Sequence, residues 1–134
     1  MSSDVNALEQ AVHAVIKPVI ELRHDLHAHP EIGLKEFRTA KAVAQKLRDV
    51  GCDAVTEGVG GTGVVALIHG KRPGNHTVAF RADMDALPMT EATGCPWTSR
   101  QAGLMHGCGT TGIRPGPLPS QPLFVRHAIL PERP

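Results

Sequence analysis

The sequence predicts an α/β layered domain, in which two helices are followed by strands of a mixed sheet and then by an unstructured proline-rich tail. Three observations support this fold class. Two stretches repeat apolar residues every three or four positions, which is the period of a helix face. Two short runs, Val64–Ile68 and Thr77–Arg81, have the composition of strands. Six of the eleven prolines lie after Thr110, where a central strand would not tolerate them.

The first predicted helix starts near Ser3 or Asp4, either of which can cap it. Pro18 lies inside the helical pattern and lacks a backbone N–H, so we expect a kink or a split there. One face of this helix is apolar and is expected to pack on a core: Val5, Leu8, Val12, Val15, Val19, Leu22 and Leu26.

The second predicted helix runs from about Lys35 to Val50 and ends at Gly51, a residue type typical of helix C-termini. Its apolar side consists of Phe37, Ala40, Val43, Ala44, Leu47 and Val50. The following run G-V-G-G-T-G (58–63) precedes a strand and does not open a helix, so it predicts a flexible turn and not a phosphate-binding loop. A second turn is predicted at 70–75, and the strands on either side of it are expected to make part of the sheet antiparallel.

Three histidines near the end of the first helix admit two interpretations. His24 and His27 would share a helical face, which is compatible with metal binding. Pro30 biases His29 away from helical backbone, so the three side chains would not converge easily. A hydrogen-bonded structural turn is therefore the favoured interpretation.

Composition limits the classes of function. The chain has 134 residues, enough for one domain with a core, and a net charge of +1. With charges of both signs interspersed and few aromatic residues, nothing indicates nucleic-acid or membrane partners. Three cysteines without regular spacing indicate a reducing compartment. No signal peptide and no membrane span is apparent, so we expect a cytoplasmic protein.

Carboxylate, imidazole and thiolate groups gather between Val78 and Gly109. Asp83 and Asp85 follow a predicted strand, and His106 and Cys108 lie in a glycine-flanked turn. Such groups are ligands of Zn²⁺-type ions. M-H-G-C is not a standard zinc spacing, however, and a complete site needs further ligands.

Several blocks of sequence occur together in one known family. R-H-D-L-H-A-H-P-E-I-G-L-K-E is followed by G-V-G-G-T-G-V-V-A, then by R-A-D-M-D-A-L-P, and finally by G-L-M-H-G-C-G. In this order the blocks resemble the hippurate hydrolase, N-acyl-amino-acid and auxin-conjugate hydrolase branch of the zinc aminoacylase/carboxypeptidase family. The resemblance covers roughly Leu22 to Gly109.

The resemblance implies a mixed-sheet, zinc-peptidase-like catalytic domain with an inserted smaller domain. It also implies hydrolysis of the amide bond of N-acyl amino acids at a centre of two divalent ions, Zn, Mn or Co, in full-length relatives that are expected to be homo-oligomers. Cys108 matches the cysteine metal ligand of the family. Asp85 matches an aspartate near the metals and is the candidate catalytic residue, while Asp83 and His106 are further candidates near the site.

The pattern departs from the family after Gly109. The family continues H-D-G-H-T-A, whereas this chain has T-T-G-I-R-P. A single missing base accounts for the change. The DNA string CACGACGGGCATACGGCC encodes H-D-G-H-T-A, and when its first base is removed, the same string encodes T-T-G-I-R-P. In the same shifted frame, the last eight residues can be back-translated to S-R-N-F-A-G-T-A, which resembles a later family segment. The sequence therefore predicts an incomplete amino-terminal part of the catalytic domain over 1–109 and an out-of-frame tail over 110–134. Since further ligands are missing, the chain is expected to be inactive and to hold metal poorly.

Two other functions remain open from the sequence. The proline-rich tail could serve a small non-catalytic adaptor as a ligand for an aromatic groove. A small redox or zinc-storage protein is a third interpretation, which the lack of a C-x-x-C pair disfavours.

Overall fold

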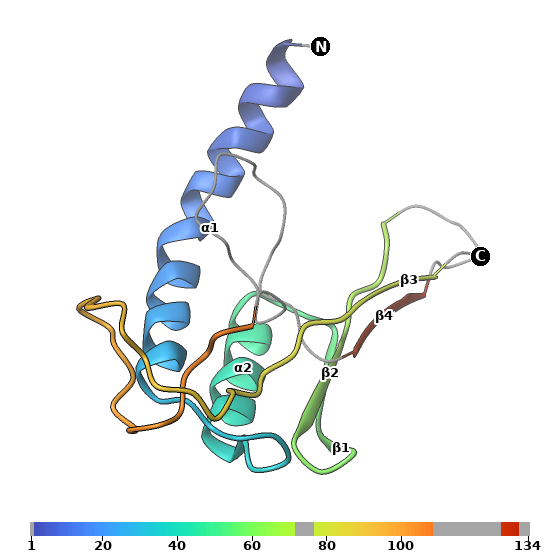
Figure 1. The fold of residues 1–134 in the computed structure, drawn as a ribbon. Coiled ribbons are helices and arrows are strands. Elements are labelled where there is room, and N and C mark those ends of the chain that lie inside the picture. Colours follow the sequence, from blue (N-terminus) through green and yellow to red (C-terminus); the bar gives the residue numbers. More distant parts are fainter. Residues whose placement is uncertain (1, 72–76, 109–126, 132–134) are drawn as a thin grey trace.

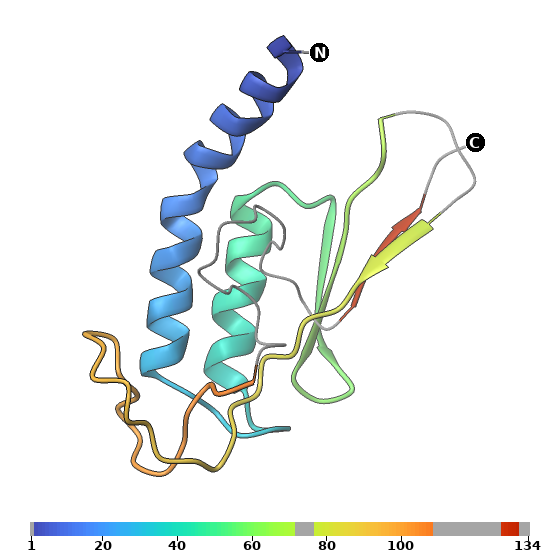
Figure 2. The same ribbon diagram turned by 45° about the horizontal axis from the view of Figure 1, so that its top comes forward.

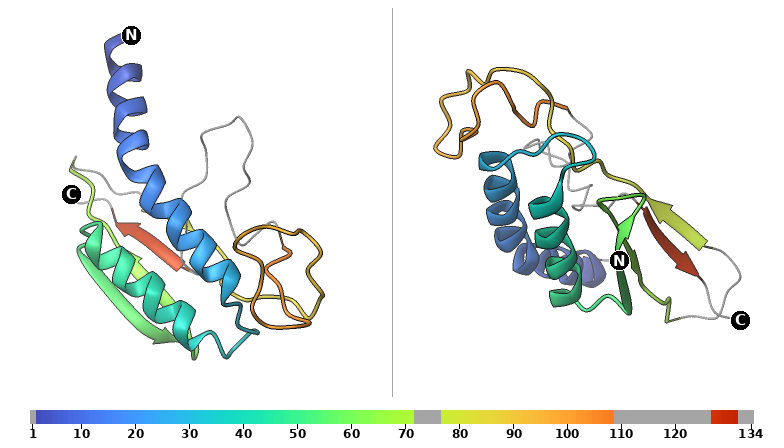
Figure 3. Two further views of the ribbon diagram at one scale, coloured as in Figure 1. Left: turned by 90° about the vertical axis from the view of Figure 1, so that its left-hand side faces the viewer. Right: turned by 90° about the horizontal axis from the view of Figure 1, so that it is seen from below.

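The structure is a computed structural model that describes residues 2–71, 77–108 and 127–131. Two helices, α1 (Ser2–Ala28) and α2 (Phe37–Asp49), lie side by side, and α2 packs against a four-stranded sheet (Figures 1 and 3). The strands are β1 (Ala54–Val59), β2 (Gly63–Leu67), β3 (Thr77–Phe80) and β4 (His127–Pro131), in the spatial order β1-β2-β4-β3. This arrangement confirms the predicted α/β class with a mixed sheet.

Helix α1 continues without a break through Pro18, so the predicted split is wrong. Its carboxyl-terminal half packs on the core through Leu26, which is buried, and Leu22, which is partly buried. Its amino-terminal half extends away from the rest of the molecule, and Val12 and Ile16 are exposed there (Figures 1 and 2). Of the residues of the predicted apolar face whose burial the structure describes, Leu22 and Leu26 near the end of the helix pack on the core, whereas Val12 is exposed.

Neither helix in the described part of the chain is long and apolar enough to cross a bilayer.

The start of α2 is completed by a carboxylate from outside the helix. The backbone N–H groups of Arg38 and Thr39 donate to Glu31 over 3.0 and 2.7 Å. The first N–H groups of a helix have no intrahelical acceptor, and a negative charge beside them is favourable. Glu36, at the N-cap position, makes no such bond.

The end of α2 follows the predicted glycine signal. Gly51 has a φ of +85°, the left-handed conformation that glycine adopts without steric cost. The N–H of Gly51 donates to Arg48 O, and the N–H of Cys52 donates to Leu47 O. These two bonds satisfy carbonyls that would otherwise lack partners at the helix end.

The core lies between the two helices and the sheet. Of the predicted apolar side of α2, Ala40, Val43 and Ala44 are buried. Phe37 and Val50, on the same predicted side, are 64% and 60% exposed. They lie at or beside the ends of α2, where neighbouring elements no longer cover the helix. The central cluster contains Leu26, Ala40, Val43, Ala44, Val64 and Met84.

The glycine-rich run 58–63 forms the turn of an antiparallel hairpin between β1 and β2, as predicted for a turn before a strand. The pairing shifts register between Glu57 and Val59, and Gly58, Gly60 and Gly61 adopt positive φ. At Gly63 an added Cβ would lie 2.3 Å from the carbonyl oxygen of Val59, so a side chain cannot be accommodated without movement of the backbone.

Strand β4 changes the predicted arrangement of the sheet. It pairs in parallel with β2 and antiparallel with β3, so β2 and β3 are not direct neighbours. The expectation of an unstructured tail over 110–134 is therefore wrong for His127–Pro131. The other residues of the tail lie outside the described residues, as do residues 72–75 of the predicted turn at 70–75.

A buried hydrogen bond ties the start of α2 to the hairpin and yields a stability prediction. Thr62 Oγ1 donates to the Glu36 carboxylate over 2.5 Å, and the two residues are 4% and 2% exposed. Thr62→Val keeps the shape but leaves the buried carboxylate without this donor, so it should lower the free energy of unfolding by about 2 kcal/mol. Urea denaturation followed by circular dichroism measures the change. Thr56→Val, at an exposed position of β1, should change it by less than about 0.5 kcal/mol. Equal effects of the two variants would contradict the prediction.

Candidate functional site

Short backbone pairings bring the two sequence blocks of interest together. Ala86 forms a parallel bridge with Ile32, and its N–H donates to Glu31 O over 2.8 Å. Leu87 and Met105 form an antiparallel bridge through two hydrogen bonds of 2.9 and 3.0 Å. The D-M-D-A-L-P block therefore lies beside the M-H-G-C block, although the two are far apart in sequence.

The two aspartates lie in different surroundings. Asp83 Oδ1 is 3.1 Å from Arg81 Nη2, and its side chain is 27% exposed. Asp85 lies against the turn before α2, where a Cβ added at Gly33 would be 3.7 Å from Asp85 Oδ2. Asp83 is thus already paired with a cation within its own segment, whereas Asp85 faces the turn that follows α1.

The structure brings His106 beside Asp85, although the two are far apart in sequence. Both of its ring nitrogens are shielded from solvent. Burial lowers the pKa of His106, and the neighbouring His27 lowers it further. The backbone and carboxylate of Asp85 and the carboxylate of Glu31 act in the opposite direction. The rings of His106 and His27 are 6.2 Å apart.

Cys108 is exposed and lies three residues beyond the bridge at Met105. Among the residues that the structure describes, no three His, Cys, Asp or Glu side chains are arranged to hold a metal ion. Structural zinc sites use four protein ligands and catalytic ones usually three. The described residues therefore do not form the metal centre that the resemblance implies, and the roles of Cys108, Asp85, Asp83 and His106 stay predictions.

The histidines at the end of α1 contact the loop 88–104 and its neighbourhood. His24 stacks on Trp97, with the ring centroids 3.6 Å apart. His29 Nδ1 lies 2.8 Å from Asp25 O, and Arg100 Nη1 donates to His29 Nε2 over 3.2 Å. The backbone N–H of Arg100 also donates to the α1 residue Ala28, over 2.9 Å. The structural interpretation of these histidines agrees with these contacts.

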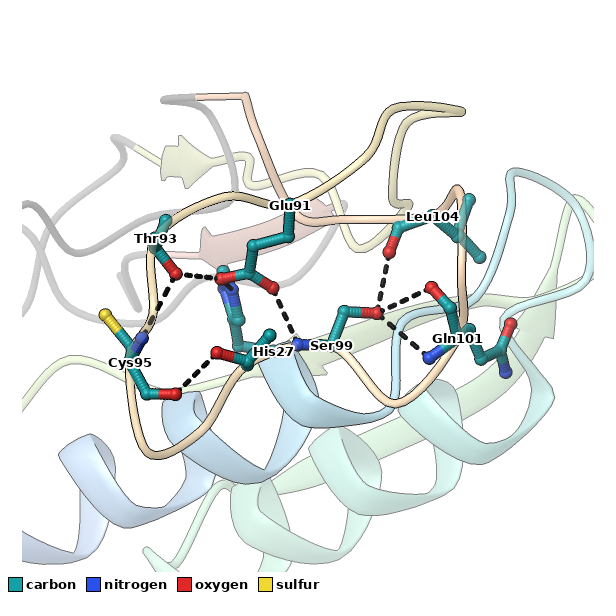
Figure 4. Close-up of polar contacts among 8 residues, drawn as sticks. His27, Glu91, Thr93, Cys95, Ser99, Gln101 and Leu104 are labelled. Atoms are coloured by element: carbon teal, nitrogen blue, oxygen red, sulfur yellow. Dashed lines mark hydrogen bonds and ion pairs between the residues drawn. The ribbon is translucent and has the colours of Figure 1, made fainter.

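A further contact between this loop and α1 is centred on Glu91 (Figure 4). His27 Nε2 donates to Glu91 Oε1 over 2.9 Å, and the side chains are 13% and 3% exposed. The N–H of Ser99 donates to Glu91 Oε2 over 2.6 Å, and the Thr93 hydroxyl donates to Oε1. One nearly buried carboxylate thus gathers donors from α1 and from both arms of the loop.

These donors change the acidity of Glu91. Burial by itself raises the pKa of a carboxyl group, because it disfavours the charged form. Here the hydrogen bonds from Ser99, Thr93 and His27, together with the charge of His27, outweigh burial and lower the pKa of Glu91 from 4.5 to about 2. Glu91 is therefore ionised at neutral pH, and its carboxylate accepts hydrogen bonds from His27 and from the loop.

Sequence analysis missed Glu91 because it belongs to none of the motifs. The available signal was its isolation: no other acidic residue occurs between Asp85 and Cys108. Because the chain also has three clustered histidines, a single carboxylate in this loop could have suggested an ion pair between Glu91 and one of them.

The lowered pKa predicts how stability depends on pH. A carboxyl group whose pKa falls on folding stabilises the folded state above its unfolded pKa, and this contribution is lost as the pH falls toward the folded pKa. For Glu91 the loss should extend from about pH 4.5 down to about pH 2. The stability difference between the wild-type chain and Glu91→Gln should therefore shrink over that range, as measured by thermal unfolding. A difference that stays constant with pH would contradict this assignment. Glu57→Gln, which breaks an exposed pair with Arg48, should give a small difference throughout.

The comparisons with known proteins agree with the position of these blocks. Residues 79–114 match the profile of peptidase family M20/M25/M40. The chain is 45% identical over 106 residues to thermostable carboxypeptidase 1 of Saccharolobus solfataricus, covering 78% of this chain and 26% of that protein. It is 45% identical over 92 residues to hippurate hydrolase of Campylobacter jejuni, covering 69% of this chain and 24% of that protein.

A solved structure gives the same relationship. The Bacillus subtilis YXEP protein, described as a dinuclear metal-binding peptidase of the M20 family, matches with a TM-score of 0.63 and 38% identity. The match covers 70% of this chain and 26% of that one. The chain is therefore related, in sequence and in fold, to peptidase family M20/M25/M40, and it spans about a quarter of the length of the curated relatives that it matches.

Proposed function

We propose that the chain carries part of a metal-dependent amidohydrolase whose complete form hydrolyses the amide bond of small N-acyl amino acids. We also propose that the 134-residue chain does not catalyse this reaction by itself. The observation that carries the second statement is the lack of any group of three metal-binding side chains among the described residues.

The names of the relatives support the proposed substrate class. Besides hippurate hydrolase, the chain is 43% identical over 90 residues to an N-acetyldiaminopimelate deacetylase of Exiguobacterium sibiricum. Hippurate is an acylated glycine, and an N-acetylated diamino acid is likewise an amide of an amino acid. Cleavage of an amide between an acyl group and an amino acid is the reaction that these two names share.

The proposed roles of individual residues rest on the family resemblance. Cys108 would be a metal ligand because it matches the cysteine ligand of the family, and its exposed position in the structure is compatible with this role. Asp85 would act beside the ions, where the neighbouring His106 responds to its charge. Asp83 is assigned a supporting position only, because Arg81 already neutralises it. The ions would be Zn, Mn or Co, and the protein would be cytoplasmic, as its cysteine content indicates.

The residues after Gly109 support an interrupted reading frame as the cause of inactivity. The six residues from Thr110 match the family string H-D-G-H-T-A after the loss of one base. Further metal ligands would then be encoded in the original frame and would be missing from this chain. A centre with one or two protein ligands should release its ion readily.

An assay of the purified chain tests the proposed inactivity. With Zn²⁺, Mn²⁺ or Co²⁺ added, hydrolysis of hippurate and of N-acetyl amino acids should not exceed the rate without protein. Turnover that persists through repurification and disappears with a chelator would overturn the proposal.

Restoring the frame tests the proposed activity. Sequencing through codon 110 and adding one base there should open a longer frame that begins H-D-G-H-T-A. The resulting protein should hydrolyse N-acyl amino acids, and Cys108→Ser in it should reduce kcat/KM by at least about a hundredfold. Cys52→Ser, at a cysteine beside the end of α2, is the matched control and should retain activity. If no longer frame opens, the missing-base explanation is wrong.

A further inference from the structure

We propose that His27, Glu91 and Ser99 are positioning residues, which fix the segment Leu104–Cys108 relative to α1. None of the three would be a metal ligand. The inference deepens the proposed function, and it rests on that function because it takes Cys108 as a metal ligand. Its structural content, a defined position for the segment that carries Cys108, can be tested separately.

The first link connects α1 to the loop. Glu91 is 3% exposed and accepts hydrogen bonds from His27 Nε2 at 2.9 Å and from the N–H of Ser99 at 2.6 Å. Hydrogen bonds to a charged group that is shielded from water are stronger than those between neutral groups. Because both donors converge on one carboxylate, the position of Ser99 is defined relative to the last turn of α1 (Figure 4).

The second link connects Ser99 to the segment. Ser99 Oγ lies 2.7 Å from the carbonyl oxygen of Leu104 and 3.0 Å from that of Gln101. A hydroxyl has a single hydrogen to donate, and the shorter distance favours Leu104. The N–H of Gln101 in turn donates to Ser99 Oγ over 3.1 Å, which fills an acceptor position of the same oxygen.

The third link places the segment itself. Met105 follows Leu104 directly and exchanges two hydrogen bonds with Leu87. An unbroken series of hydrogen bonds thus leads from α1 through Glu91 and Ser99 to the residue that precedes M-H-G-C. The stacking of Trp97 on His24 and the contacts of Arg100 with Ala28 and His29 dock the same stretch of the loop on α1, on either side of Ser99.

Amide hydrogen exchange in the 134-residue chain measures whether the segment depends on this series. Glu91→Gln should increase exchange at the N–H groups of Met105 and Leu87 on the order of tenfold, because a buried hydrogen-bond network loses its charged acceptor. Exchange at the buried core residue Val64 should not change. Glu57→Gln, which breaks an exposed ion pair on the hairpin, should leave all three amides unaffected.

Two further variants separate positioning from a general structural effect. Ser99→Ala removes the hydroxyl but keeps the backbone N–H that donates to Glu91, so exchange should rise at Met105 while the loop stays docked. His27→Gln retains a donor near the position of Nε2 and should restore most of the protection that His27→Ala loses. No difference between Glu91→Gln, Ser99→Ala and Glu57→Gln at Met105 would overturn the proposal. Loss of protection at Val64 in both Glu91→Gln and Ser99→Ala would overturn it as well, because the residues would then support the whole fold.

A metal probe distinguishes failure of this inference from failure of the proposed function. Co²⁺ bound by a thiolate gives a charge-transfer absorption, which Cys108→Ser should abolish in the frame-restored protein. If that absorption is absent while exchange at Met105 still depends on Glu91, the ligand assignment fails and the positioning role stands. If Co²⁺ binds through Cys108 but exchange does not respond to Glu91, only the positioning role fails.

Discussion

A long loop without regular structure keeps one conformation only if its polar groups find partners, since each fixed residue costs conformational entropy. In this chain the requirement is met at the carboxyl-terminal end of α1. Glu91 binds the helix and both arms of the loop through a single carboxylate. The last turn of α1 therefore binds the loop as well as forming part of the core. The position of the segment from Leu104 to Cys108 depends on that turn.

The segment just after α1 contacts both α2 and the chain that follows β3. Glu31, shortly after α1, completes the first turn of α2 with its carboxylate, and its carbonyl oxygen accepts from Ala86. One short segment thus orients the second helix and the chain that leaves β3. Displacement of α1 would consequently disturb α2, the aspartate block and the loop together.

The sequence was informative wherever a local signal decides the conformation. Gly51 marks the end of α2 because its backbone must adopt positive φ, and the glycine-rich run 58–63 forms a tight turn for a similar reason. Pro18 left a kink or a split open, and the split did not occur, because a proline removes one backbone donor without preventing the helix from continuing, as α1 does. The period places Phe37 on the apolar side of α2, yet Phe37 is exposed, because burial depends on what covers the first turn of a helix.

Contacts between distant parts of the chain could not be predicted from local sequence signals. The insertion of β4 between β2 and β3 joins segments separated by about fifty residues, and it includes a proline at its last position. The pair of His27 and Glu91 is of the same kind, since neither residue has a pattern that identifies its partner. For the candidate site, the sequence identified the blocks that come together, whereas the role of Glu91 in holding the loop between them on α1 became clear from the structure.

The stacking of Trp97 on His24 has a consequence for spectroscopy. Trp97 is the sole tryptophan and the chain contains no tyrosine, so ultraviolet emission arises almost entirely from one indole ring. That ring belongs to the docked loop and not to the hydrophobic core. Its fluorescence consequently follows release of the loop, whereas far-ultraviolet dichroism follows melting of the helices. Two optical signals from the unlabelled chain can therefore distinguish local opening from global unfolding.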